Sequence, residues 1–132
     1  MRKTILSAIA ILLLTACQES LEEKCEREAR EYTRRNCPAK VEENVVVDSM
    51  TFDRNTHTIH YHYRLTGLAD KEGALDATQA RQLLLKALKN TTALQACKDA
   101  DYNFAYTYRS EKEPQRTWLD IVLRPEDYKG HE

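Results

Sequence analysis

The clearest pattern in the chain is the strict alternation of apolar and polar side chains over residues 58–65. This period of two predicts a β-strand with one buried face and one wet face. Three further segments are rich in β-branched and aromatic residues and predict strands in the same way. Those segments are residues 45–52, 104–108 and 119–123. Residues 53–56 provide a turn between the first two strands, and residues 111–115 join the last two as a hairpin loop.

Apolar residues spaced three and four apart predict two helices. The first begins after Ser20, which forms a capping box with Glu23, and runs to about Asn36. The second follows Asp76, an N-cap residue. Its apolar stripe consists of Ala80, Leu83, Leu84, Ala87 and Leu88.

The predicted order of elements is therefore α-β-β-α-β-β. Each helix has one apolar stripe, and each strand has one apolar face. A two-layer arrangement, with the helices packed on the sheet, buries these surfaces against each other. We predict an α+β fold: a four-stranded antiparallel sheet with two helices packed on one face. The pattern leaves the order of the strands within the sheet open.

The first 17 residues follow a different pattern. Two basic residues precede an apolar run over residues 5–14, which is too short to cross a bilayer as a helix, and small residues lead to Cys17. The tetrapeptide over residues 14–17 resembles the lipobox of bacterial lipoproteins. That resemblance implies cleavage of residues 1–16 and acylation of Cys17, with palmitate among the acids that would label it. Gln18, at a position where retention in the inner membrane favours Asp, implies the outer membrane.

Composition supports one domain over residues 17–132. Removing residues 1–16 from 132 leaves 116, enough for a single modest core. Arg2 and Lys3 leave with the signal, so 18 basic residues face 21 acidic ones in the mature chain. A slightly acidic protein is a poor partner for nucleic acid. We expect the membrane, through the lipid anchor, and another envelope protein as its partners.

Three cysteines besides Cys17 would reach an oxidising compartment. Cys25 and Cys37 lie about 18 Å apart along the first helix, too far for a disulfide. We predict a Cys37–Cys97 disulfide between the ends of the two helices. A Cys25–Cys97 bond and the absence of any intramolecular bond are the alternatives.

A resemblance extends over most of the mature chain. The matching residues are 37–43, 47–49, 106–108 and 123–128. They are similar to segments of a loose group of small uncharacterised bacterial envelope lipoproteins. Those relatives carry a glycine between the last two strands, where this chain has residues 111–115 without one. The resemblance implies the α+β fold and an envelope location, and it adds nothing about a substrate.

Candidate chemistry is sparse. His60 and His62 share one strand face at a spacing found in zinc sites, so a zinc-type metal-binding protein or enzyme on this face is the alternative function. The third ligand would come from Asp48, Asp120 or His131. No phosphate loop, nucleophile elbow or zinc-protease motif occurs in the sequence. We therefore expect no enzyme and no cofactor.

The wet side of the predicted sheet is the remaining candidate. It combines a tryptophan with histidines and arginines, a composition typical of protein interfaces. The predicted interaction face consists of His60, His62, Arg64, Arg109, Trp118 and Arg124. Burial of Trp118 under a loop or under the C-terminal segment is the alternative. We predict a non-catalytic binding or accessory lipoprotein of the cell envelope.

Overall fold

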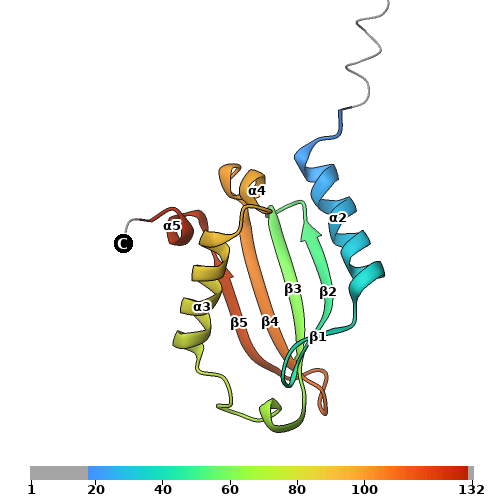
Figure 1. Cartoon of the computed structure of the whole chain (residues 1–132), viewed down its shortest axis with the longest axis vertical. Coiled ribbons are helices and arrows are strands. Elements are labelled where there is room, and N and C mark those ends of the chain that lie inside the picture. The colour runs from blue at the N-terminus through green and yellow to red at the C-terminus, as the bar shows by residue number, and fades with distance from the viewer. Residues whose placement is uncertain (1–17, 131–132) are drawn as a thin grey trace, which may run out of the picture.

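The computed structural model describes residues 18–130, so Cys17, the predicted signal and His131 lie outside the described residues. Helices and strands mix along the chain, which confirms the α+β class (Figure 1). The elements are α2 (Leu21–Asn36), β1 (Ala39–Glu42), β2 (Val45–Asp53), β3 (Thr58–Leu65), α3 (Ala77–Asn90), α4 (Gln95–Asp99), β4 (Asn103–Ser110), β5 (Thr117–Leu123) and α5 (Pro125–Tyr128). A 3-10 turn spans Gly67–Ala69.

The sheet has five strands in the order β1-β2-β3-β4-β5, where four were predicted. The additional strand, β1, is only four residues long and pairs with β2 from Ala39 opposite Val47. Only Ala39 of its residues is even half-buried. A strand this short and exposed lacks the alternation by which the others were predicted.

The prediction of a fully antiparallel sheet is wrong at one pair. β3 and β4 run parallel, with Ile59 opposite Phe104 and Leu65 opposite Ser110. Parallel neighbours need a crossover of a dozen or more residues, usually helical. The 37 residues between β3 and β4 contain α3 and α4, and they provide that crossover.

Both predicted helix starts are confirmed. The Ser20 hydroxyl accepts a hydrogen bond from the Glu23 amide at 3.1 Å, and the Glu23 carboxylate accepts one from the Ser20 amide at 3.2 Å. The Asp76 carboxylate accepts from the Gln79 amide at 2.9 Å. These bonds satisfy amides that a first turn leaves without partners, which explains why both helices begin where they do.

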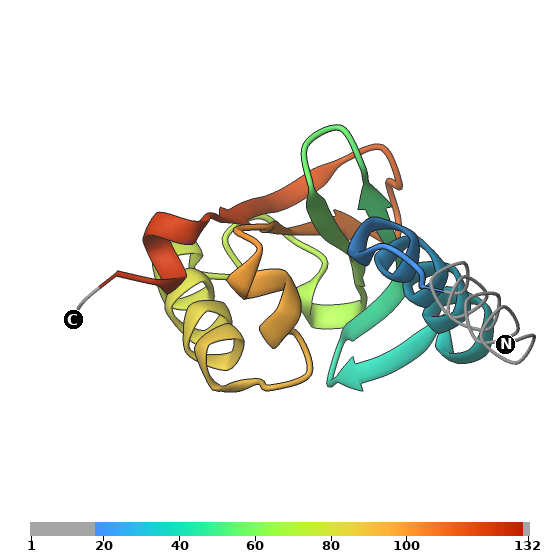
Figure 2. The same ribbon diagram turned by 90° about the horizontal axis from the view of Figure 1, so that it is seen from above.

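The core lies between the helices and the apolar face of the sheet. Its fully buried large side chains are Val47, Ile59, Leu65, Phe104 and Leu123. Seen from above, α2 and α3 lie at opposite ends of the molecule with α4 between them (Figure 2). α2 packs along β2, where the Thr33 hydroxyl bonds both the amide and the carbonyl of Met50 at 2.9 Å. β1 pairs with only part of β2, and further along the same strand α2 satisfies the backbone hydrogen-bonding groups of Met50. Among residues 18–130, no helix combines the length and apolar character needed to cross a membrane.

Candidate functional site

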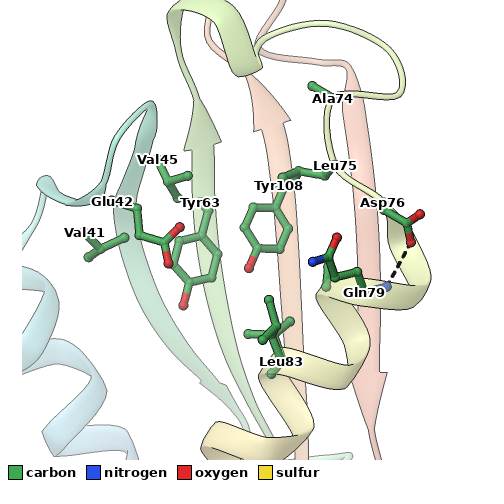
Figure 3. A pocket seen from close by; sticks show the side chains of 12 residues that line it. Val41, Glu42, Val45, Tyr63, Ala74, Leu75, Asp76, Gln79, Leu83 and Tyr108 are labelled. Atoms are coloured by element: carbon green, nitrogen blue, oxygen red, sulfur yellow. Dashed lines mark hydrogen bonds between the residues drawn. The ribbon is translucent and has the colours of Figure 1, made fainter.

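A groove of about 400 Å³ opens between α3 and the β1–β2 hairpin (Figure 3). Its floor is the sheet, and its two walls come from segments that are far apart in the sequence. The lining residues are Val41, Glu42, Val45, Tyr63, Ala74, Leu75, Asp76, Gln79, Ala80, Leu83, Leu84 and Tyr108. We call this the α3–β1 groove. Its volume is within the range of pockets that bind small ligands or a few partner side chains.

Two tyrosines form the floor of the α3–β1 groove. Tyr63 on β3 and Tyr108 on β4 are direct neighbours in the parallel register, and their rings stack at 4.7 Å with planes 11° apart. Figure 3 shows the two phenol rings side by side between the walls. Burial raises the pKa of Tyr108 to about 12 and also raises that of Tyr63. Both hydroxyls therefore stay protonated at neutral pH and can donate and accept hydrogen bonds.

The same stacking continues along the strands. Tyr61 and Tyr106 form the next parallel pair, with ring centroids 5.4 Å apart and planes 8° apart. Aromatic side chains in fixed rows present a large contact area and lose little conformational entropy on binding. Tyr61 and Tyr106 are not part of the groove lining, so this second pair supports the floor without forming it.

The walls are apolar and open to solvent. Val41 on β1 is 50% exposed and Leu83 on α3 is 61% exposed, although both are large hydrophobic residues. Figure 3 shows them on opposite sides of the tyrosine floor. Exposed apolar side chains that face each other across a groove are typical of binding sites.

Two acidic side chains line the groove. Glu42 follows Val41 on β1, and Asp76 caps α3 across the groove, where its carboxylate bonds the Gln79 amide (Figure 3). Among residues 18–130, no lysine, arginine or histidine lines the groove. The α3–β1 groove thus combines apolar and aromatic side chains with two carboxylates.

The predicted histidine pair does form on the other face of the sheet. The rings of His60 and His62 stack at 4.0 Å. His60 Nε2 lies 2.7 Å from the Thr107 hydroxyl, which in turn donates to Asp120 at 2.5 Å, and His62 Nε2 lies 3.0 Å from the Thr51 hydroxyl. Burial lowers the pKa of both histidines, that of His62 to about 4. The pair is therefore neutral at pH 7.

The two described candidates for a third zinc ligand, Asp48 and Asp120, are engaged in other hydrogen bonds. Asp48 accepts hydrogen bonds from Arg64 at 3.2 Å, and Asp120 accepts one from Thr107. Within residues 18–130 there is no group of three or more His, Cys, Asp or Glu residues that could hold a metal ion. The described structure gives the zinc alternative no support.

The arginines and Trp118 of the predicted interaction face divide among different contacts. Arg64 pairs with Asp48 and also with Glu111 at 2.5 Å. Arg109 is exposed on β4, and Arg124 is exposed immediately before α5. Trp118 donates a hydrogen bond to Asp70 at 2.9 Å and packs against the core, while Arg116 lies 4.4 Å over its ring.

A register shift explains the position of Trp118. Tyr108 pairs with Leu119, whereas the next residue, Arg109, pairs with Thr117. Trp118 is therefore the additional residue of a β-bulge and leaves the alternation on which its assignment depended. The structure brings His60 and His62 together as predicted, but it does not gather all six residues into one surface.

The cysteines also differ from the prediction. The Sγ atoms of Cys25 and Cys97 lie 3.4 Å apart in the buried contact between α2 and α4. Cys37 is the C-cap of α2, twelve residues and about 18 Å further along the helix. The structure therefore brings Cys97 to Cys25, the alternative pair, and not to Cys37. The crossover places α4 beside the start of α2, which the sequence pattern did not reveal.

Sequence reasoning missed the α3–β1 groove. Leu83 belongs to the predicted apolar stripe of the second helix, and Tyr63 and Tyr108 lie within predicted strands, so their pattern indicates a core and not a binding site. Val41 lies on the strand that was not predicted. One available signal was the 37-residue connection before β4, long enough to make β3 and β4 parallel and bring their tyrosines into register.

The sequence belongs to a described family. The family characterised as a domain of unknown function (DUF8479) matches residues 20–119. The chain is a DUF8479 protein. None of the curated proteins compared with it matches at a significant level.

Solved structures share the DUF8479 fold. A small protein of Pseudomonas aeruginosa described as secreted has a TM-score of 0.69 at 13% identity, over 84% of this chain and 99% of its own. The pilotin EpsS of the Vibrio vulnificus type 2 secretion system has a TM-score of 0.66 at 11% identity, over 84% and 94%. The type II secretion pilotin AspS of Vibrio cholerae has a TM-score of 0.60 at 13% identity, over 81% and 91%. At these identities the likeness shows a common fold.

Proposed function

We propose that this DUF8479 protein is a lipid-anchored accessory protein of the bacterial cell envelope that binds a segment of another envelope protein without catalysing a reaction. The observation that carries the proposal is the α3–β1 groove, with its stacked tyrosine floor and exposed apolar walls. The lipobox-like sequence before Cys17 supports the location. The likeness of the fold to two secretion pilotins supports an accessory role beside a secretion system.

The anchor would place the groove near a membrane. Acylated Cys17 would be the first residue of the mature chain, and α2 begins four residues later at Leu21. Two or more acyl chains hold a protein on a bilayer far more firmly than one. With Gln18 next to the anchor, the outer membrane is the destination that we propose.

The occupant that fits the groove is an amphipathic helix of the partner. Large exposed apolar side chains stand on both walls, so recognition depends on apolar side chains that enter between Val41 and Leu83. A helix presents such side chains at positions i, i+3 and i+4. Because Glu42 and Asp76 make the groove acidic, the partner helix should carry lysine or arginine beside its apolar stripe.

The first test compares two exposed leucines. Leu83 lines the groove at 61% exposure, whereas Leu68, in the turn Gly67–Ala69, is 83% exposed and does not line it. Full-length wild type, Leu83→Asp and Leu68→Asp are purified from detergent-solubilised membranes. We expect one envelope protein to accompany wild type and Leu68→Asp and to be lost with Leu83→Asp. Equal recovery with all three, or with none, contradicts binding in the groove.

The anchor has a separate test. Cells that produce the full chain are labelled with palmitate, with Cys17→Ala as the control. We expect label on the wild type and none on the variant, because acylation requires the Cys17 sulfur. An unlabelled wild type refutes the anchor without bearing on the groove.

A further inference from the structure

Two buried thiols meet between helices that are distant in the sequence. Cys25 lies in the second turn of α2 and Cys97 in α4, and their Sγ atoms are 3.4 Å apart. Cys25 is 5% exposed and Cys97 is 7% exposed. Figure 1 shows the first turns of α2 and the short α4 at the same end of the sheet. Sulfurs this close need only a small approach to reach bonding distance.

We propose that Cys25 and Cys97 form a disulfide bond in the mature protein and that this bond fastens the lipid-anchored helix to the rest of the domain. The inference depends on the proposed function in one respect, because export would bring the thiols to a compartment where disulfides persist. The oxidant is a disulfide-bearing protein of the envelope. One cysteine thiolate attacks the disulfide of the oxidant, and the second displaces the oxidant from the mixed disulfide. The two cysteines lose two protons and two electrons, and the oxidant leaves as a dithiol.

The two cysteines are oxidised during folding and not after the protein has packed. Burial raises the pKa of Cys25 to about 12 and also raises that of Cys97. Since the thiolate is the attacking species, the packed thiols react slowly. The bond therefore forms as α2 docks, while the cysteines are still exposed to the oxidant.

The position of the bond suits a tethered helix. Cys25 and Ala29 are the only two residues of α2 that are fully buried. Of these two residues, Cys25 is nearer to Cys17 and follows it by eight residues in the sequence. A pull on the membrane anchor would reach α2 first, and the Cys25–Cys97 bond holds the helix near the point where that pull enters.

Cys37 serves as the internal comparison. It caps the other end of α2, is half-buried, and has no sulfur neighbour among the described residues. Trypsin separates the three cysteines onto peptides 25–27, 36–40 and 90–98. Each pairing therefore gives a distinct product.

The experiment uses the full chain, exported from its own signal and extracted from membranes with detergent. Free thiols are alkylated, and the unreduced protein is digested and analysed by mass spectrometry. We expect peptide 25–27 joined to peptide 90–98, with Cys37 alkylated. A link between peptides 36–40 and 90–98, or three alkylated thiols in protein recovered from the envelope, overturns the proposal.

A second experiment tests the disulfide independently of the proposed location in the envelope. The full chain is denatured, reduced and refolded with reduced and oxidised glutathione. The Cys25–Cys97 peptide should dominate here too, even if the protein in cells fractionates with the cytoplasm. Such fractionation would refute the envelope role alone. Failure of the 25–97 bond to dominate on refolding refutes the disulfide.

Discussion

The indole nitrogen of Trp118 donates a hydrogen bond to the carboxylate of Asp70 at 2.9 Å. The other oxygen of the same carboxylate accepts from the Lys112 amide at 3.0 Å. Asp70 thereby joins the segment after β3 to both sides of the β4–β5 hairpin. Hydrogen bonds from Ser110, from the Lys112 amide and from Trp118 hold the pKa of Asp70 at about 2, below its usual value.

Asp70→Asn should lower the thermal midpoint, because the amide replaces a charged acceptor that these donors share. Glu72→Gln, an exposed neighbour, should leave the midpoint unchanged. Because the pKa of Asp70 is lower in the folded protein than in the unfolded chain, its carboxylate stabilises the fold. This contribution is complete above the unfolded pKa of about 3.9 and is lost as the pH falls towards 2. The difference between wild type and Asp70→Asn, followed by tryptophan fluorescence, should therefore shrink over that interval. A difference that is independent of pH would show that the charge is unimportant.

His62→Gln should make the protein less sensitive to mild acid. The pKa of His62 is lowered to about 4 by burial, by the neighbouring His60 and by Arg109. Between about pH 6.5 and pH 4 the unfolded chain binds a proton that folded His62 does not, so stability falls as the pH falls. Urea unfolding at pH 7 and pH 4.5 should show a smaller loss for His62→Gln than for wild type. Equal losses would mean that His62 does not contribute to acid sensitivity.

Lys98→Met should destabilise the protein by about 2 kcal/mol. The Lys98 side chain is buried, and its ammonium group donates to the carbonyls of Leu88 and Thr91, each at 2.7 Å. These carbonyls end α3, where helices have no internal donors. Methionine fills similar space without donating. Lys86→Met, on the exposed side of α3, is the control for urea unfolding and should be neutral. Equal midpoints for both variants would contradict this capping role.

Reduction of the proposed Cys25–Cys97 bond should lower the free energy of unfolding by about 4 kcal/mol on the chain-entropy account, because the bond closes a loop of roughly 70 residues. Unfolding in urea with and without a phosphine reductant measures the difference. Cys37→Ser should respond to the reductant as wild type does, and Cys25→Ser should not respond. A reductant effect that survives in Cys25→Ser would assign the bond to another pair.

Leu83→Asp should fold normally. The side chain is 61% exposed, and substitutions at such positions change the free energy of unfolding by about 0.5 kcal/mol or less. Thermal unfolding should give midpoints for Leu83→Asp and Leu68→Asp close to that of wild type. A large loss of stability in Leu83→Asp would mean that its effect on partner recovery cannot be attributed to binding.

The sequence was sufficient for the elements whose local pattern is strong. The alternation over residues 58–65 and the caps at Ser20 and Asp76 act within a few residues, so β3, α2 and α3 were predicted close to their observed bounds. β1 was missed because its four residues, three of them exposed, carry no alternation.

The structural features that the sequence did not predict depend on contacts between segments that are distant in the chain. The parallel register of β3 and β4 sets Tyr63 beside Tyr108, and the path of the crossover sets Cys97 beside Cys25. The bulge that removes Trp118 from the outer face is likewise a property of the paired strands. The groove depends on the parallel register and on a strand that was not predicted, so no local pattern could reveal it.

Photo-cross-linking in intact cells tests most directly whether the groove holds a partner. Benzoylphenylalanine is introduced at position 83 of the full chain, with position 68 as the control, and the cells are irradiated. The α3–β1 groove should yield one dominant adduct at position 83 and none at position 68. Sequencing should map the cross-link to an amphipathic helix of an envelope protein, with basic residues beside its apolar stripe. No adduct at position 83, or the same adduct from both positions, would contradict the claim that this groove holds the partner.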